Sequence, residues 1–266
     1  MQGTLRVTVA VQCWGAAGLR LLHPGWSPLA QMKTVAAEAE IGHYAALDYG
    51  TAAFLVAAGL LSLTRPMWPV LLPVVGLFVA DAVAPIGADD NWLLYPAAAA
   101  RAASIVAPLA LALLDWFPPK ARFSLARFLI AIAGIRYATA ATFAAWGLIA
   151  IAESRHPGTL SSALTAIPSE FGQTSLSPDA AGWAMALVGA IHWAFAMNVV
   201  STRSRMVVAM LAGWALLCAA LPIYAVGARG LLDAAVRAAE VGAPLVLVLY
   251  WTRAIAERGD VLRAAA

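Results

Sequence analysis

The chain has 266 residues, of which 62% are hydrophobic and 12% are charged. A soluble domain carries about 25% charged residues, so a water-soluble protein is excluded and we expect the surface to face a lipid bilayer. The net charge of +3 indicates no nucleic-acid partner, because the basic residues are distributed as a membrane topology requires. The two cysteines and the histidines have no metal-binding spacing, so no metal site is predicted.

Eight mainly apolar segments follow along the chain, each close to the ~20 residues that a membrane-spanning helix needs. They cover 7–22, 45–63, 68–86, 92–114, 128–151, 181–200, 204–226 and 230–252. The sequence lacks the alternating segments of about 10 residues that are typical of membrane β-barrels. We therefore predict an all-α fold, a polytopic membrane protein with eight transmembrane helices.

The basic residues between these segments predict the orientation. With a cytoplasmic N-terminus, the inner side holds Arg6, Arg65, Lys120, Arg122, Arg127, Arg203, Arg205, Arg253, Arg258 and Arg263, whereas the outer loops hold Lys33, Arg155 and Arg229. Cytoplasmic loops carry an excess of Lys and Arg. We expect a multi-pass protein of the bacterial inner (cytoplasmic) membrane with both termini cytoplasmic. The first residues lack a strongly basic start and an A-x-A-like end, so we expect no cleaved signal peptide.

Short motifs recur along the chain in the same order, at intervals of 132 to 138 residues. They are Trp-Gly (14 and 146), His-Pro-Gly (23 and 156), Thr-Arg (64 and 202), Pro-Ile (85 and 222) and a lone arginine (101 and 237). We predict two tandem four-helix membrane repeats, 1–115 and 128–253, with a cytoplasmic linker at 116–127 and a cytoplasmic tail at 254–266. Because each repeat has an even number of helices, an axis along the membrane normal should relate them.

Each repeat has an arginine ahead of a helix that ends in Trp-Gly, then His-Pro-Gly, a long outer loop and three further helices. In this pattern the chain resembles the DoxX-like family of four-helix membrane proteins, here as a tandem duplication. The resemblance implies a membrane subunit of a quinone-linked oxidoreductase, such as a thiosulfate:quinone or terminal quinol oxidase. It implies a quinone as ligand, other membrane or periplasmic subunits as partners, and at most a non-catalytic or quinone-binding role in an enzyme. The family also leads us to expect an acidic residue near the middle of the second helix, whereas Asp48 lies near its outer end.

Six ionisable side chains fall within the predicted spans, all in the half toward the outer face. They are Asp48, Asp81 and Arg101 in the first repeat, and Asp233, Arg237 and Glu240 in the second. The last three are spaced i, i+4 and i+7, so they share one helix face. A charged side chain at mid-helix costs at least about 2.5–3.5 kcal/mol. Such residues therefore indicate either mutually neutralising pairs or a functional site.

Both interpretations of these side chains stay open. In the structural one, Arg101 pairs with Asp81 or Asp48, and Arg237 with Asp233 or Glu240. In the functional one, the arginines bind a carbonyl, carboxylate or quinone oxygen in a polar pocket open to the outer face. In either case we expect Arg101 and Arg237 to face the protein interior, because an unpaired guanidinium that deep could not easily reach water.

His192 is the one histidine well inside a predicted span. We expect it to be buried and hydrogen-bonded to a neighbour, and a hydrogen bond to a quinone is the functional alternative. A bis-histidine haem is disfavoured because the other three histidines belong to outer loops. We expect Arg136 to be an inner-face anchor, like Arg6. The candidate ligand-binding residues are thus Arg101, Asp81, Asp48, His192, Arg237 and Glu240.

Three functions fit these observations. The first is an integral membrane subunit of a quinone-linked redox complex, which anchors partners or holds a quinone in an outer-half polar pocket. The second is a structural accessory subunit of a larger membrane assembly without its own ligand. The third is a small-molecule transporter, favoured by the repeat and by the glycine and proline in the helices. Few polar residues occupy the cytoplasmic half, where alternating access would need a path, so we rank the transporter last.

Overall fold

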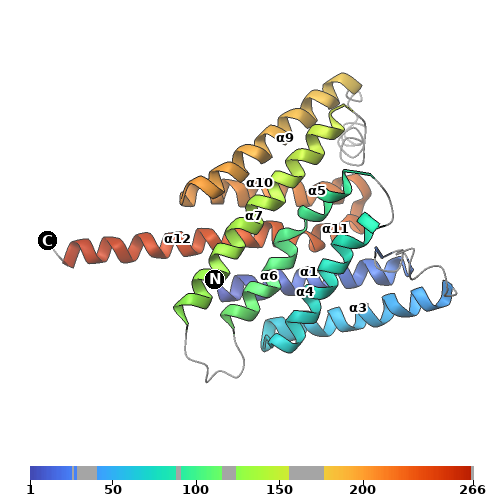
Figure 1. The fold of residues 1–266 in the computed structure, drawn as a ribbon, viewed down its shortest axis with the longest axis horizontal. Coiled ribbons are helices and arrows are strands. Elements are labelled where there is room, and N and C mark those ends of the chain that lie inside the picture. Colours follow the sequence, from blue (N-terminus) through green and yellow to red (C-terminus); the bar gives the residue numbers. More distant parts are fainter. Residues whose placement is uncertain (26, 29–40, 88–90, 116–123, 156–176, 265–266) are drawn as a thin grey trace.

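The computed structural model describes residues 1–25, 27–28, 41–87, 91–115, 124–155 and 177–264. Within these ranges all regular structure is helical and no strand occurs, which confirms the all-α class (Figure 1). Most of the predicted linker and the second His-Pro-Gly triplet lie outside the described residues.

The helices follow one another in the same order in both halves of the chain. The first half contains α1 (Gln2–Leu22), α3 (Ile41–Thr64), α4 (Trp68–Val83), the 3-10 turn η1 (Ala84–Gly87), α5 (Leu94–Ala99) and α6 (Ala102–Leu114). The second half contains α7 (Leu125–Glu153), α9 (Pro178–Ser201), α10 (Arg205–Val226), η2 (Gly227–Arg229), α11 (Gly230–Val236) and α12 (Ala238–Ala264). Each half therefore ends in a short helix, a break of one or two residues and a longer helix.

Serine residues begin three helices of the second half. The hydroxyl oxygens of Ser124, Ser177 and Ser204 accept the backbone N–H three residues on, at the starts of α7, α9 and α10. These side chains satisfy N–H groups that the first helical turn leaves without a partner. In the first half, Pro66 disfavours helix at the residue before it, so α3 ends at Thr64.

Within the described residues, six helical segments are long and apolar enough to cross a membrane, and they fall on six of the eight predicted spans. These are Ala45–Thr64, Trp68–Ile86, Leu94–Leu114, Leu125–Glu153, Asp179–Ser201 and Arg205–Tyr224. The other two, 7–22 and 230–252, fall on α1 and on α11 with α12, and eight spans are therefore not confirmed. Both segments are less apolar than the other spans: α1 carries Arg6, Gln12 and Arg20, and Asp233, Arg237 and Glu240 lie in α11, at the break and in α12.

Helix α1 and the first part of α12 pack inside the bundle, whereas the C-terminal part of α12 extends away from it (Figure 1). Leu5 and Val9 of α1 are fully buried, as are Val246 and Leu247 of α12. Helix α1 packs on α3 of its own half and on α11 and α12 of the other, while α7 packs on α9 and on α5 and α6 (Figure 1). The first helix of each half thus lies against the broken helix of the other half. Polar groups in α1 and α12 consequently contact protein.

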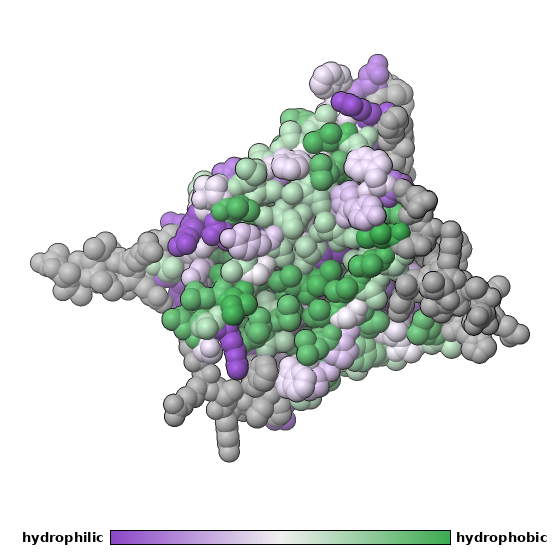
Figure 2. Space-filling model, in the orientation of Figure 1, coloured by the Kyte–Doolittle hydropathy of each residue, from purple (hydrophilic) through white to green (hydrophobic). Residues whose placement is uncertain are grey.

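The outer surface of the bundle is apolar. Large hydrophobic side chains that are more than half exposed occur on several helices, among them Leu60, Ile130, Trp183, Leu187, Met206 and Leu217. Figure 2 shows hydrophobic residues over the central part of one face and strongly hydrophilic residues toward its edges. A water-soluble monomer rarely exposes contiguous apolar area of this kind. The surface is compatible with a multi-pass protein in a lipid bilayer.

Gly15 brings α1 against the end of α11. A Cβ atom on Gly15 would lie 2.6 Å from the backbone nitrogen of Val236, which leaves no room for a side chain. Small residues allow two membrane helices to approach this closely. The contact fixes α1 beside Arg237, the residue that follows Val236.

Candidate functional site

Both repeated arginines lie at a helix break with the same backbone conformation. Arg101 lies between α5 and α6 with φ −88° and ψ 4°, and Arg237 lies between α11 and α12 with φ −83° and ψ 5°. The N–H of each donates to the carbonyl three residues earlier, Ala98 or Ala234, at 3.1 Å. The sequence predicts both segments as continuous spans. The structure divides each span at the arginine.

Prolines seven residues after each arginine weaken the first turns of α6 and α12. Pro108 has no N–H to donate to the Ser104 carbonyl, and Pro244 has none for the Glu240 carbonyl. In the first half the freed Ser104 carbonyl accepts a hydrogen bond from Gln12 Nε2 of α1 at 3.0 Å. Helix α1 therefore supplies the donor that the proline removes, and it secures α6 just after Arg101.

Both breaks open into one cavity of about 1110 Å³. We call it the break cavity. Seven charged residues line it, from six helices: Arg20, Asp81, Arg101, Glu153, Asp233, Arg237 and Glu240. Phe78, Trp146 and Ile149 contribute apolar and aromatic surface. Sites for small molecules combine an apolar lining with a few polar groups in this way.

Trp146 organises the second-half side of the break cavity. The Arg237 guanidinium carbon lies 4.6 Å from the centre of the Trp146 ring, which is a cation–π contact. The indole nitrogen donates to Glu240 Oε1 at 3.2 Å. Glu240 is buried, and the charges of both Arg237 and Arg101 act on its carboxylate. Sequence reasoning noted Trp146 only as a repeat landmark, because nothing along α7 shows which helix it faces.

Arg101 has no carboxylate partner among the residues that the structure describes. Its side chain is exposed and lines the break cavity. The predicted pairing of Arg101 with Asp81 or Asp48 is wrong, because Arg20 of α1 takes both acids. Arg101 and Arg237 both line the break cavity, although the predicted burial is not reached: Arg101 is exposed and Arg237 is half-buried.

Arg20, Asp48 and Asp81 form a buried ionic cluster. Arg20 Nη2 donates to Asp81 Oδ2, and Arg20 Nε lies 3.9 Å from Asp48 Oδ1. Asp48, only 1% exposed, also accepts the Gly25 N–H at 2.7 Å. Gly25 has φ +83°, which glycine adopts without strain, and this explains the glycine of the first His-Pro-Gly triplet. Arg20 is not among the candidate residues predicted from the sequence, because its acid partners come from other helices.

Asp81 keeps one oxygen available. Its Oδ1 is buried and has no hydrogen-bond partner within the described ranges, although the residue lines the break cavity. A buried acceptor without a partner is unfavourable unless something donates to it. Asp81 therefore offers a ligand an acceptor next to the Arg20 guanidinium.

His192 lies apart from the break cavity. Its Nδ1 is 2.8 Å from the Val188 carbonyl, and its Nε2 accepts from Trp214 Nε1 at 3.4 Å. The ring also stacks on Phe143, with centres 5.5 Å apart. Both ring nitrogens are thus used within the protein, as the structural interpretation predicts.

The break cavity brings together Arg101, Asp81, Arg237 and Glu240, while Asp48 stands behind Arg20 and His192 stands elsewhere. Among the described residues, no group of three or more His, Cys, Asp or Glu side chains could hold a metal ion. Comparison of the chain with protein-family models, with curated proteins and with solved structures finds no match. The resemblance to the DoxX-like family stays a prediction.

Proposed function

We propose that the protein is an eight-span inner-membrane subunit of a quinone-linked redox complex, with both termini cytoplasmic, and that the break cavity holds a quinone head group. The observation that carries the proposal is the pair of arginines, one from each half, at matching helix breaks on one cavity. A guanidinium donates to carbonyl and carboxylate oxygens, and a donor in a water-poor site contributes more than one in water.

The chemistry of the lining suits a ring with oxygens on opposite sides. Arg101 and Arg237 come from opposite halves and can donate to different oxygens. Trp146 and Phe78 provide surface for an aromatic ring. Asp81 Oδ1 can accept a hydroxyl hydrogen from the reduced form. A bound quinone would supply the acceptor for electrons and protons, and the residues of this chain would bind its oxygens and exchange protons with it.

The proposal predicts that purified protein binds a short-chain quinone. The tryptophan fluorescence of the wild-type protein should be quenched on titration with a one-isoprene benzoquinone or naphthoquinone. Arg101→Gln and Arg237→Gln should each weaken binding about tenfold or more, since a hydrogen bond to a charged group contributes about 1.5–3 kcal/mol. The matched control is Arg229→Gln, an exposed arginine of η2 that does not line the break cavity.

Two results would remove this assignment. Wild type that binds neither quinone would favour the structural accessory subunit, which needs no ligand of its own. If Arg229→Gln weakens quinone binding as much as Arg101→Gln and Arg237→Gln do, the net charge of the protein and not the break cavity governs binding.

A specific observation also favours the transporter as second candidate. Helices interrupted at corresponding positions of two repeats are typical of transporter binding sites, and α5–α6 and α11–α12 have this arrangement. A transporter would expose the break residues to each membrane face in turn, whereas a redox subunit would expose them to one face. Thiol labelling from both faces separates the two.

A further inference from the structure

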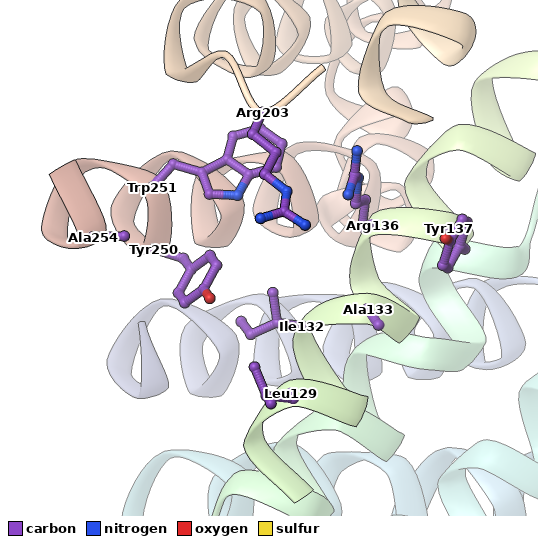
Figure 3. A pocket seen from close by; sticks show the side chains of 9 residues that line it. All are labelled: Leu129, Ile132, Ala133, Arg136, Tyr137, Arg203, Tyr250, Trp251 and Ala254. Atoms are coloured by element: carbon purple, nitrogen blue, oxygen red, sulfur yellow. The ribbon is translucent and has the colours of Figure 1, made fainter. Parts of the chain in front are cut away.

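A second cavity, of about 400 Å³, lies between the first turns of α7, the α9–α10 connection and α12 (Figure 3). We call it the Arg136–Arg203 pocket. It lies at the end of the molecule where α9 ends and α10 begins, which the predicted topology assigns to the cytoplasmic face. Two arginines and two aromatic residues, Tyr250 and Trp251, surround it, together with Leu129 on the side of α7.

Arg136 is held rigidly in this pocket. Its Nε donates to the Val199 carbonyl at 2.8 Å, and its Nη2 donates to the Val200 and Thr202 carbonyls at 2.7 and 3.1 Å. Its guanidinium carbon lies 5.8 Å from the centre of the Trp251 ring. The side chain caps the end of α9, as an anchor would. Its positive charge meets only carbonyl dipoles and a ring.

The side chain of Arg203 contacts no partner among the described residues. Its side chain is exposed and makes no hydrogen bond or ion pair with any residue in the described parts of the chain. Figure 3 shows its guanidinium directed toward the space between Trp251 and Arg136. Within the same ranges no carboxylate pairs with Arg136 either. Among the side chains that the structure describes, these two guanidinium groups therefore share one pocket without a counter-charge.

The corresponding place in the first half is neutralised. Arg6, the repeat mate of Arg136, donates to Asp115 through Nε at 2.8 Å and Nη2 at 2.5 Å. The interval of 136 residues that relates Arg101 to Arg237 relates Asp115 to Trp251. The second half thus has an aromatic ring where the first has a carboxylate. An anion from outside the chain would supply the negative charge that Asp115 supplies in the first half.

We propose that the Arg136–Arg203 pocket binds the phosphate of an anionic phospholipid. Guanidinium groups bind phosphate through paired, charge-assisted hydrogen bonds, and basic pockets between membrane helices on the cytoplasmic side take lipid head groups. Tyr250 and Trp251 are the residue types that favour head-group depth. Leu129 is 48% exposed beside the pocket and offers apolar surface to an acyl chain. This apolar wall distinguishes a lipid from free phosphate.

The test uses full-length protein, delipidated in a mild detergent, and measures the thermal shift on adding phosphatidylglycerol, phosphatidylcholine or inorganic phosphate. A ligand that binds only the folded state raises the melting temperature. We expect phosphatidylglycerol to stabilise wild type and the other two additions to have little effect. Arg203→Gln should need about tenfold more phosphatidylglycerol than wild type to reach the same thermal shift. Arg205→Gln, an exposed arginine that does not line the pocket, should respond like wild type.

Native mass spectrometry of the same variants counts retained lipid directly and does not depend on the melting transition. Wild type and Arg205→Gln should retain one phosphatidylglycerol more than Arg203→Gln. The proposal fails if Arg203→Gln keeps the full response and the same lipid count, or if phosphatidylcholine stabilises equally well. It also fails if inorganic phosphate reproduces the shift, because the ligand would then be a soluble anion.

Discussion

The two halves of the molecule place their buried charge differently. The first half has the cluster of Arg20, Asp48 and Asp81, in which one arginine pairs with two acids. The predicted repeat aligns these positions with residues 152, 186 and 218, which are alanine, alanine and cysteine. The second half has the pair of His192 and Trp214 where the first has Phe54 and Leu77.

The break arginines are what the halves share. Because Arg20 contacts both acids of the first half, Arg101 pairs with neither of them and its donors face the break cavity. Arg237 stacks on Trp146 near Glu240. The comparison teaches that different arginines serve the two roles: Arg20 pairs with the buried acids, and Arg101 and Arg237 line the break cavity. The sequence alone had suggested Arg101 and Arg237 for both roles.

The largest effect should come from Arg20→Gln. Removing one partner of a buried ionic cluster leaves uncompensated charge and costs about 3–5 kcal/mol. We expect a matching loss of unfolding free energy in mixed detergent micelles, partly recovered by adding Asp81→Asn. Cys218→Ala, at the position that the repeat aligns with Asp81, should have little effect. Equal, small losses for Arg20→Gln and Cys218→Ala would show that the cluster is incidental.

Gly15→Ala should have the second-largest effect on stability. A methyl group there would meet the backbone of α11, whereas one on Gly147 would meet mainly the Trp193 side chain of its own half. Overpacking of this kind costs about 1–3 kcal/mol, so the melting temperature should fall. Gly76→Ala, with open space around it, is the control and should be neutral or slightly stabilising. A neutral Gly15→Ala would contradict the close approach of α1 and α11.

Asp115→Asn should change stability by about 1 kcal/mol or less, because its pair with Arg6 is partly exposed. The loss should shrink as salt is added. The same change leaves Arg6 without its carboxylate, like Arg136, so thermal stabilisation by phosphatidylglycerol should increase. An unchanged lipid response would mean that a missing carboxylate is not what distinguishes the second half.

His192→Phe should have the smallest effect on function. It places in the second half the residue type that the repeat aligns from the first, Phe54. Loss of the Trp214 hydrogen bond should cost about 1 kcal/mol. Quinone titration should be unchanged, because His192 does not line the break cavity. Weakened quinone binding at unchanged stability would show that His192 contributes to the quinone site.

The sequence was sufficient for the helical class and for most helix bounds, because the length of the apolar segments determines these. It did not identify the partners. Arg20 and Asp81 are 61 residues apart, and helical periodicity says which face a residue occupies but not which helix covers that face. The breaks at the arginines were also missed. The prolines at 108 and 244 could have indicated the breaks. Each proline lacks the N–H for a carbonyl four residues earlier, in the helical turn that follows the arginine.

The most direct test of the central claim is thiol accessibility at the two breaks. In a protein with Cys13→Ala and Cys218→Ala, Arg101→Cys and Arg237→Cys are labelled in sealed, oriented vesicles with a membrane-impermeant reagent. We predict that both react from the same membrane face, that Arg203→Cys reacts from the opposite face, and that the buried control Ala243→Cys reacts from neither. Labelling of Arg101→Cys and Arg237→Cys from opposite faces, or failure of either to react, would contradict a shared cavity.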